Sequence, residues 1–387
     1  SPDPAFSGID VPIASSFLMS SKARNEVWVK PIVEKSEKKI TYKIQKRGTK
    51  VEIDSAKKGT KLGRGASFQC LISGAAITPE YVKACGKNGS MSETMIAVLI
   101  ERDGKRLFIE PHEIQEKIAK SAKPGWVPSI KLPNHSQYVG VLGYGFEDFG
   151  DLFSNRQLAA LEVFSDLINE ASSKAYADAK TNMIADETSL EENGRGALAY
   201  SQAIELYLAF AVDRLADYGS TLATWAPGGF IRSTYSRHAI QMTWDYAECN
   251  FFSEGTGNFL GAVDWVSKAI AGLPAKGIGQ LVQCDAQSAE YPAGAVISSD
   301  PPYYDNIPYA DISAFFYSWM KKSVGKTFPK TLSTIAVPKM EELVADRMRH
   351  GSATNAEQFF LHGMRSAVEA MVSGSQDEAP AAIYYAF

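Results

Sequence analysis

Two short apolar segments in the last third of the chain, residues 279–285 and 294–300, each end in an aspartate. Short apolar runs bounded by turn residues are typical of strands buried in an α/β sheet. Because such sheets bind ligands at the carboxyl ends of their strands, Asp285 and Asp300 predict a ligand-binding edge. The flanking patterns predict two helices and a last strand-like run, over residues 311–322, 354–372 and 383–387.

The first hundred residues have the alternation of apolar and polar side chains that is typical of strands. The predicted strands are centred on residues 27–32, 40–44 and 51–53. Farther along, Asp103-Gly104 lies between the apolar runs 95–100 and 106–109, which predicts a hairpin. Helical spacing then predicts helices over residues 154–168, with Ser154 as cap, 197–218 and 257–272.

These patterns predict a three-part α/β chain without internal repeats. We expect residues 1–6 to be a leader outside the fold and residues 123–149, rich in Pro and Gly, to be a surface linker. The three predicted parts are a basic β-rich module over 7–122, a helical insertion over 150–250 and an incomplete α/β core over 251–387.

Charge is distributed unevenly along the chain. The formal net charge is -4, but residues 21–70 hold fourteen Lys and Arg against five Asp and Glu. A basic cluster of this kind either contacts phosphates or is a solvated face of a Lys-rich domain, and the sequence leaves both interpretations open. No apolar run reaches the roughly 20 residues that cross a bilayer, so we expect no membrane partner.

The four cysteines form no Cys-x-x-Cys pair and the five histidines show no metal-binding spacing. Cys70-Leu-Ile-Ser73 has one cysteine where a zinc ribbon needs two, so we expect a degenerate ribbon and no metal. The absence of a disulfide framework is typical of a protein in a reducing cytoplasm.

The run Asp300-Pro301-Pro302-Tyr303 has the groups that an amino-methyltransferase needs. An exocyclic amine of adenine or cytosine is a weak nucleophile, so the enzyme must hold its hydrogens on fixed acceptors. The Asp300 carboxylate and the Pro301 carbonyl supply two acceptors, and consecutive prolines restrict their positions. Tyr303 offers a ring face to a base turned out of the duplex, where stacking contributes about 1–3 kcal/mol. The alternative is a strand-ending turn with a packed tyrosine.

Beyond this motif, several blocks in one order resemble a known family, the large adenine-specific DNA methylases of bacteria and archaea. Members carry a zinc-ribbon module and are often encoded near phage-defence genes. The similarity runs from about residue 140 to 373 and includes Asp151–Leu158, Met242–Glu248, Asp300–Asn306, Tyr309–Ser313 and Pro338–Val344.

The resemblance implies an S-adenosylmethionine-dependent DNA methyltransferase, acting on adenine N6, with a partial Rossmann-like core. It places Asp285 near the adenine of the cofactor, and it implies that Tyr304 and Asn306 contact the substrate. DNA and other subunits of a defence system are the expected partners.

The Gly-rich turn that binds the methionine end of the cofactor in this family is not evident in the sequence. The nearest candidate, Gly140–Gly145, opens no helix directly, so we predict a surface loop there. A second hypothesis is therefore a non-catalytic DNA-binding or assembly subunit of a methylase system.

Several other residues have two open interpretations. Trp244, Asp245 and Glu248 either line a pocket or pack internally, and Arg232 and Arg237 either contact phosphates or pair with acids. Cys284 lacks a nearby histidine, so we expect a buried thiol rather than a nucleophile.

Overall fold

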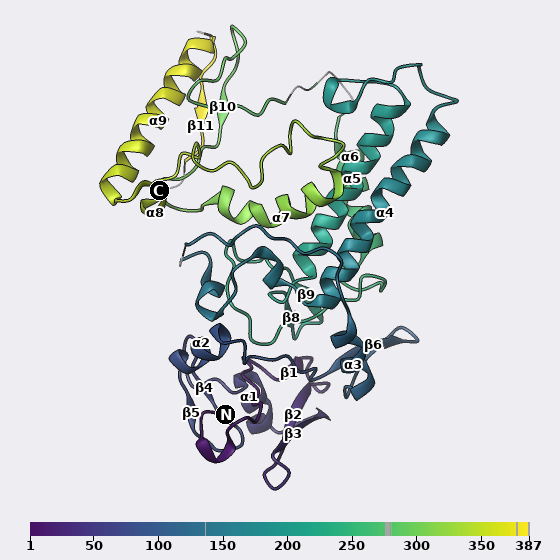
Figure 1. The fold of residues 1–387 in the computed structure, drawn as a ribbon, viewed down its shortest axis with the longest axis vertical. Coiled ribbons are helices and arrows are strands. Elements are labelled where there is room, and N and C mark those ends of the chain that lie inside the picture. The colour runs from purple at the N-terminus through teal and green to yellow at the C-terminus, as the bar shows by residue number, and fades with distance from the viewer. Residues whose placement is uncertain (136, 275–278, 280, 377, 386–387) are drawn as a thin grey trace.

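The computed structural model describes residues 1–135, 137–274, 279, 281–376 and 378–385. These residues form a mixed α/β fold in which nine α-helices accompany five small sheets. Figure 1 shows the amino-terminal module at the bottom, two long helices at the right and the carboxyl-terminal elements at the upper left. Within the described residues, no helix has the length and apolarity that a membrane span requires.

The amino-terminal module is built on an antiparallel sheet of β1 (Leu18–Ser20), β2 (Val27–Glu34) and β3 (Lys39–Lys46). Two of the strands predicted from alternation are thus confirmed. The third, at residues 51–53, is wrong, because these residues lie in helix α1 (Lys50–Lys58). Thr49 and Glu52 form a capping box that satisfies the first free N–H groups of this helix.

Two small cores hold this module together. The first includes Phe17, Trp28 and Ala56, and the second includes Phe68, Cys70 and Val82, with Phe6 packed against it. Phe6 lies in the segment expected to be a leader outside the fold. The module also contains β4 (Phe68–Gln69), β5 (Ala76–Ile77), α2 (Pro79–Lys87) and α3 (Glu113–Ser121).

The predicted hairpin is confirmed as β6 (Val98–Arg102) and β7 (Lys105–Ile109). Asp103 and Gly104 both have positive φ, at 52° and 67°, which is the backbone that a two-residue hairpin turn requires.

The Pro- and Gly-rich segment 123–149 is not a surface linker. Leu132, Val139, Val141 and Phe149 are buried in the central core, so this segment supplies one wall of it. It contains the short 3-10 helices η2 (Gly140–Tyr144) and η3 (Phe149–Leu152).

Glycines bring η2 close to helix α2. A Cβ added at Gly86 would lie 2.2 Å from the Tyr144 carbonyl oxygen, and one at Gly145 would lie 2.5 Å from the Gly86 oxygen. Only glycine permits this backbone approach. The surface loop predicted at Gly140–Gly145 is therefore a packed contact between the module and the central core.

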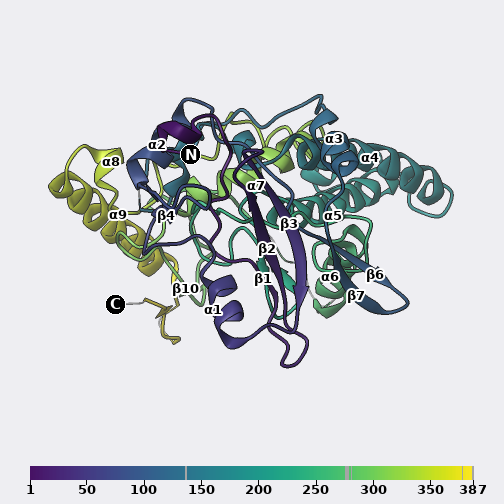
Figure 2. The same cartoon turned by 90° about the horizontal axis from the view of Figure 1, so that it is seen from below.

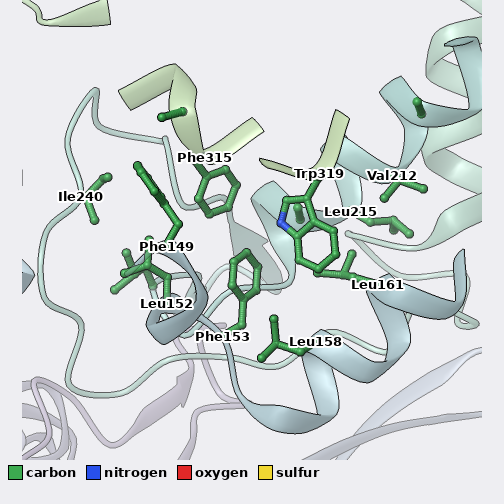
Figure 3. Close-up of a cluster of buried hydrophobic side chains, with 14 of the residues drawn as sticks. Phe149, Leu152, Phe153, Leu158, Leu161, Val212, Leu215, Ile240, Phe315 and Trp319 are labelled. Atoms are coloured by element: carbon green, nitrogen blue, oxygen red, sulfur yellow. The ribbon is translucent and has the colours of Figure 1, made fainter. Parts of the chain in front are cut away.

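The central core forms around α4 (Asn155–Ala179), α5 (Ala197–Tyr218) and α7 (Tyr309–Val324). In Figure 3, Phe315 and Trp319 of α7 lie among side chains from the other two helices and from residues 149–153. Trp319 and Leu215 are fully buried, and each such side chain contributes roughly 1.5–3 kcal/mol through the area it removes from water. The predicted insertion and the predicted α/β core thus share one hydrophobic core.

The predicted helices are confirmed, with α6 (Phe259–Gly272) packed on α5. Between α5 and α6 the chain forms the hairpin of β8 (Thr224–Ala226) and β9 (Phe230–Arg232). Ser154 caps α4 as predicted, because its hydroxyl accepts from the Gln157 N–H at 3.2 Å.

The carboxyl-terminal region has a parallel pair of two-residue strands, β10 (Ser298–Ser299) and β11 (Ala382–Ile383), with α8 (Arg347–His350) and α9 (Ala353–Gly374). The strand expected over 279–285 is wrong for its described part, since residues 281–285 have no strand partner and the Leu281 side chain is 98 % exposed. Without neighbouring strands, an apolar segment has nothing to pair with. Residues 280, 386 and 387 of the predicted strands lie outside the described residues.

Candidate functional site

The Asp300 carboxylate lies at the carboxyl end of β10, at the edge predicted for ligand binding. The Tyr384 N–H donates to the Ser299 carbonyl at 2.8 Å, so the parallel strand β11 fixes the backbone just before Asp300. Asp300 is exposed, whereas Pro301, Pro302 and Tyr303 are half-buried. The loop therefore presents the Asp300 carboxylate to solvent from a restricted backbone.

Tyr303 folds back onto this carboxylate. Its hydroxyl donates to Asp300 Oδ1 at 2.5 Å, and this hydrogen bond raises the pKa of Tyr303 above its ordinary value. The Tyr303 ring meets Tyr385 edge-on at a centroid distance of 5.4 Å. The structure thus brings Asp300 and Tyr303 together, and Tyr385 joins them from the segment that follows β11.

The turn after Tyr303 is held from two sides. The Asn306 N–H donates to the Tyr303 carbonyl at 2.8 Å, which closes the turn. The Tyr138 hydroxyl donates to the Asn306 carbonyl, so the segment that was predicted to be a linker also supports the site.

Tyr304, predicted to contact substrate, has a strained backbone with φ at 44°. Its carbonyl accepts from the Ala345 N–H at 2.8 Å, and its ring meets Phe360 of α9 edge-on at 5.2 Å. These contacts hold the residue in a backbone region that a bulky side chain rarely adopts. Strain of this kind is concentrated at binding sites and active sites.

A buried ion cluster fixes the segment that holds Tyr304. The Arg349 guanidinium contacts Asp311 Oδ2 at 2.9 Å and Glu342 Oε2 at 2.7 Å, and its Nε lies 3.4 Å from Asp346 Oδ2. Lys339 contacts the second oxygen of Asp311 at 3.0 Å. Two of the sequence blocks, Tyr309–Ser313 and Pro338–Val344, therefore meet in space through Arg349. We will call these five residues the Arg349 cluster.

Asp285, predicted to bind the cofactor, is half-buried but bonded within its own loop. Its carboxylate accepts from the backbone N–H of Gln287 at 2.9 Å and from the Gln287 side-chain amide. No hydrogen bond or ion pair joins Asp285 to Asp300–Asn306 in the described part of the chain. The hydrogen bonds of the Asp285 carboxylate thus go to Gln287 and not to the Asp300 loop.

The block around Trp244 has a structural role. The Trp244 ring packs edge-on against Phe68 at 5.3 Å and Tyr144 at 5.0 Å, beside a cleft of about 2670 Å³. Glu248 is paired with Arg156 at 2.6 Å, and burial raises the pKa of its carboxyl. Trp244 thus joins the amino-terminal module to the central core, whereas Glu248 pairs with α4.

Asp245 completes that attachment. Its Oδ2 accepts from the Ser16 N–H at 3.1 Å, and burial raises the pKa of the carboxyl to about 6. A carboxyl whose folded pKa exceeds its unfolded one stabilises less as it ionises.

We therefore expect the protein to lose about 3 kcal/mol of stability from this group as pH rises from below 4 to above 6, because the folded pKa is about 6 and the ordinary value is 3.8. Urea unfolding at a series of pH values measures the slope. Asp245→Asn should flatten it, and Asp178→Asn, which removes an exposed carboxylate, should leave it unchanged. An equal slope in the Asp245 variant would contradict the assignment.

The remaining candidates are exposed and take no part in the site. Arg232 and Arg237 form no ion pair in the described residues, and Arg232 lies over the Phe230 ring. Cys284 is exposed, so the expectation of a buried thiol is wrong. Among the residues that the structure describes, no three His, Cys, Asp or Glu side chains are placed to hold a metal ion.

Sequence reasoning missed Tyr138, Tyr385 and two members of the Arg349 cluster, Arg349 and Asp346. These residues make contacts with segments that are far away in the sequence, so local periodicity does not predict their roles. A scan against protein-family models found no match to the chain, and searches of curated proteins and of solved structures found none either. Function is therefore inferred from the motif and from the geometry of its loop.

Proposed function

We propose that the chain is an S-adenosylmethionine-dependent DNA amino-methyltransferase acting on adenine N6. The observation that supports it is an exposed carboxylate, Asp300, at the carboxyl end of β10, with the ring of Tyr303 beside it and parallel β11 behind it. In this proposal β10 and β11 belong to a Rossmann-like core, which binds its ligand at this edge.

The chemistry follows from what the Asp300 loop presents. The carboxylate accepts one hydrogen of the amine and the Pro301 carbonyl accepts the other, which directs the nitrogen lone pair toward a methyl group. The Tyr303 hydroxyl donates to one Asp300 oxygen. The amine takes over this hydrogen bond when the base enters, and the released Tyr303 ring is then available to stack on it.

The residues predicted to bind the methyl donor fit that role less well than the Asp300 loop fits the amine. S-adenosylmethionine would supply the methyl group, but Asp285 bonds within its own loop and the glycines of η2 pack against α2. This observation favours a second candidate function, a DNA-binding or assembly subunit that needs a partner of the same defence system for methyl transfer.

The test is incubation of the chain with unmethylated DNA and S-adenosylmethionine labelled in the methyl group, followed by nucleoside analysis. The first proposal expects label in N6-methyladenine and heat on titration with S-adenosylmethionine. Label in N4-methylcytosine would move the target to cytosine. DNA binding with a steep salt dependence but neither cofactor heat nor label would support the second candidate and contradict the first.

A further inference from the structure

Six residues other than glycine have a left-handed backbone in the part of the chain that the structure describes, and three of them are basic. Arg24, Lys38 and Arg47 have φ of 64°, 53° and 58°. All three lie in turns that adjoin the sheet of β1, β2 and β3. The other three, at Asp103, Asn193 and Tyr304, are far from this sheet in sequence.

A left-handed backbone costs an L-residue roughly 1–2 kcal/mol, which glycine avoids. Asp103 and Asn193 have short polar side chains that can hydrogen-bond locally and lower this cost. Arginine and lysine have no such advantage. The three turns of one sheet therefore hold three exposed cations on strained backbone.

The three side chains lie at two ends of a rigid ribbon. Arg24 and Arg47 are at the same end, where the Arg47 N–H donates to the Glu26 carbonyl at 3.2 Å, and Lys38 is in the turn at the other end. The eight-residue strands β2 and β3 separate these ends by about 24 Å. Duplex DNA rises 3.4 Å per base pair, so this span corresponds to roughly seven base pairs.

The surrounding charge has little internal compensation. In Figure 2, β2 and β3 lie on the face turned toward the viewer, with α1 beside them. Only two cations of the sheet and α1 form ion pairs within the described residues, Lys43 with Glu110 and Lys57 with Asp54. The following exposed cations form none: Lys22, Arg24, Lys35, Lys38, Lys39, Lys46, Arg47, Lys50 and Lys58.

We propose that this sheet and its turns bind the phosphate backbone of duplex DNA, with Arg24, Lys38 and Arg47 as phosphate contacts. The choice of DNA as the polyanion rests on the proposed function. The arrangement differs from a membrane-binding element, because the cations lie at the ends of a ribbon and not along one helix above an apolar face.

The test replaces all three residues by glycine, Arg24→Gly, Lys38→Gly and Arg47→Gly, in the full chain. Glycine relieves the backbone cost, so the melting temperature should stay equal or rise. Binding to a short labelled duplex, followed by fluorescence anisotropy, should weaken about tenfold or more at moderate salt. The slope of log affinity against log salt should decrease in magnitude by about 2.7, since each lost phosphate contact removes about 0.9.

Two controls separate this surface from general effects. Asp103→Gly with Asn193→Gly places glycine at two other positions of left-handed backbone without loss of a cation. Lys174→Ala with Lys268→Ala and Arg365→Ala removes the same net charge from exposed helix positions. Both controls should bind DNA as the unmodified chain does.

The proposal is overturned if the triple glycine variant keeps the unmodified affinity and slope, or if the unmodified chain does not bind DNA. It is also overturned if the triple glycine variant loses binding to phosphatidylserine vesicles but keeps its binding to DNA. The binding assay contains no methyl donor, so a failure of methyl transfer leaves this result unaffected.

Discussion

Replacement of Asp300 by asparagine is expected to abolish methyl transfer to DNA while the chain stays folded. The asparagine amide has the shape of the carboxylate but loses its charge and one acceptor, so it no longer polarises the amine. Loss of one fixed electrostatic contact of this kind lowers the rate by about 100- to 1000-fold. Asp300 is exposed, and substitutions at exposed positions change stability by only about 0.5 kcal/mol.

The measurement is the initial rate of label transfer, with circular dichroism to check the fold. Asp305→Asn is the matched control, because it removes an exposed carboxylate from the same loop and should keep the unmodified rate. Tyr303→Phe keeps the stacking face and removes only the hydroxyl that holds Asp300, so it should retain activity. A rate within threefold of the unmodified chain for Asp300→Asn would refute the assignment of the amine pocket.

Replacement of Arg349 by methionine is expected to destabilise the carboxyl-terminal region by about 3–5 kcal/mol. The substitution leaves three carboxylates buried without their main cation, since the side chains of Asp311 and Asp346 are 4 % and 5 % exposed and that of Glu342 is 12 % exposed. Breaking a buried pair on one side costs far more than the pair contributes when intact.

Urea unfolding followed by circular dichroism measures the change. Arg365→Met is the control on α9, because Arg365 pairs with Glu369 at the surface and its loss should cost less than about 1 kcal/mol. Arg349→Lys keeps the charge but not the forked geometry and should lie between the two. Equal free energies of unfolding for the Arg349 and Arg365 variants would show that the Arg349 cluster does not stabilise the carboxyl-terminal region.

The helices and the first hairpins were predictable because their signals are local. Ser154 caps α4, and Asp103-Gly104 forms the turn between β6 and β7. Both features depend on residues that are close together in the sequence. The capping box of Thr49 and Glu52 was equally visible, and it outweighed the alternation that predicted a strand at 51–53.

The carboxyl-terminal site was predictable only in part. The Asp300 turn was recognisable from its own residues, but its supports were not, because Tyr138, Tyr385 and Arg349 reach it from distant segments. The segment after residue 280 was mispredicted because apolar residues form a strand only where a neighbour offers hydrogen bonds. Composition likewise failed for 123–149, because Leu132, Val139, Val141 and Phe149 of this Pro- and Gly-rich segment are buried.

The central core sets an order for folding on the ribosome. Its buried side chains run from Leu132 to Phe328, whereas the two cores of the amino-terminal module lie almost wholly before residue 100. The module can therefore form before the central core is complete, because the apolar faces of α4 and α5 wait for α7. From the end of α5 to the end of α7, that delay is about 5–20 s at normal translation rates. During it, the nascent chain exposes the apolar faces of two long helices, a surface prone to aggregation.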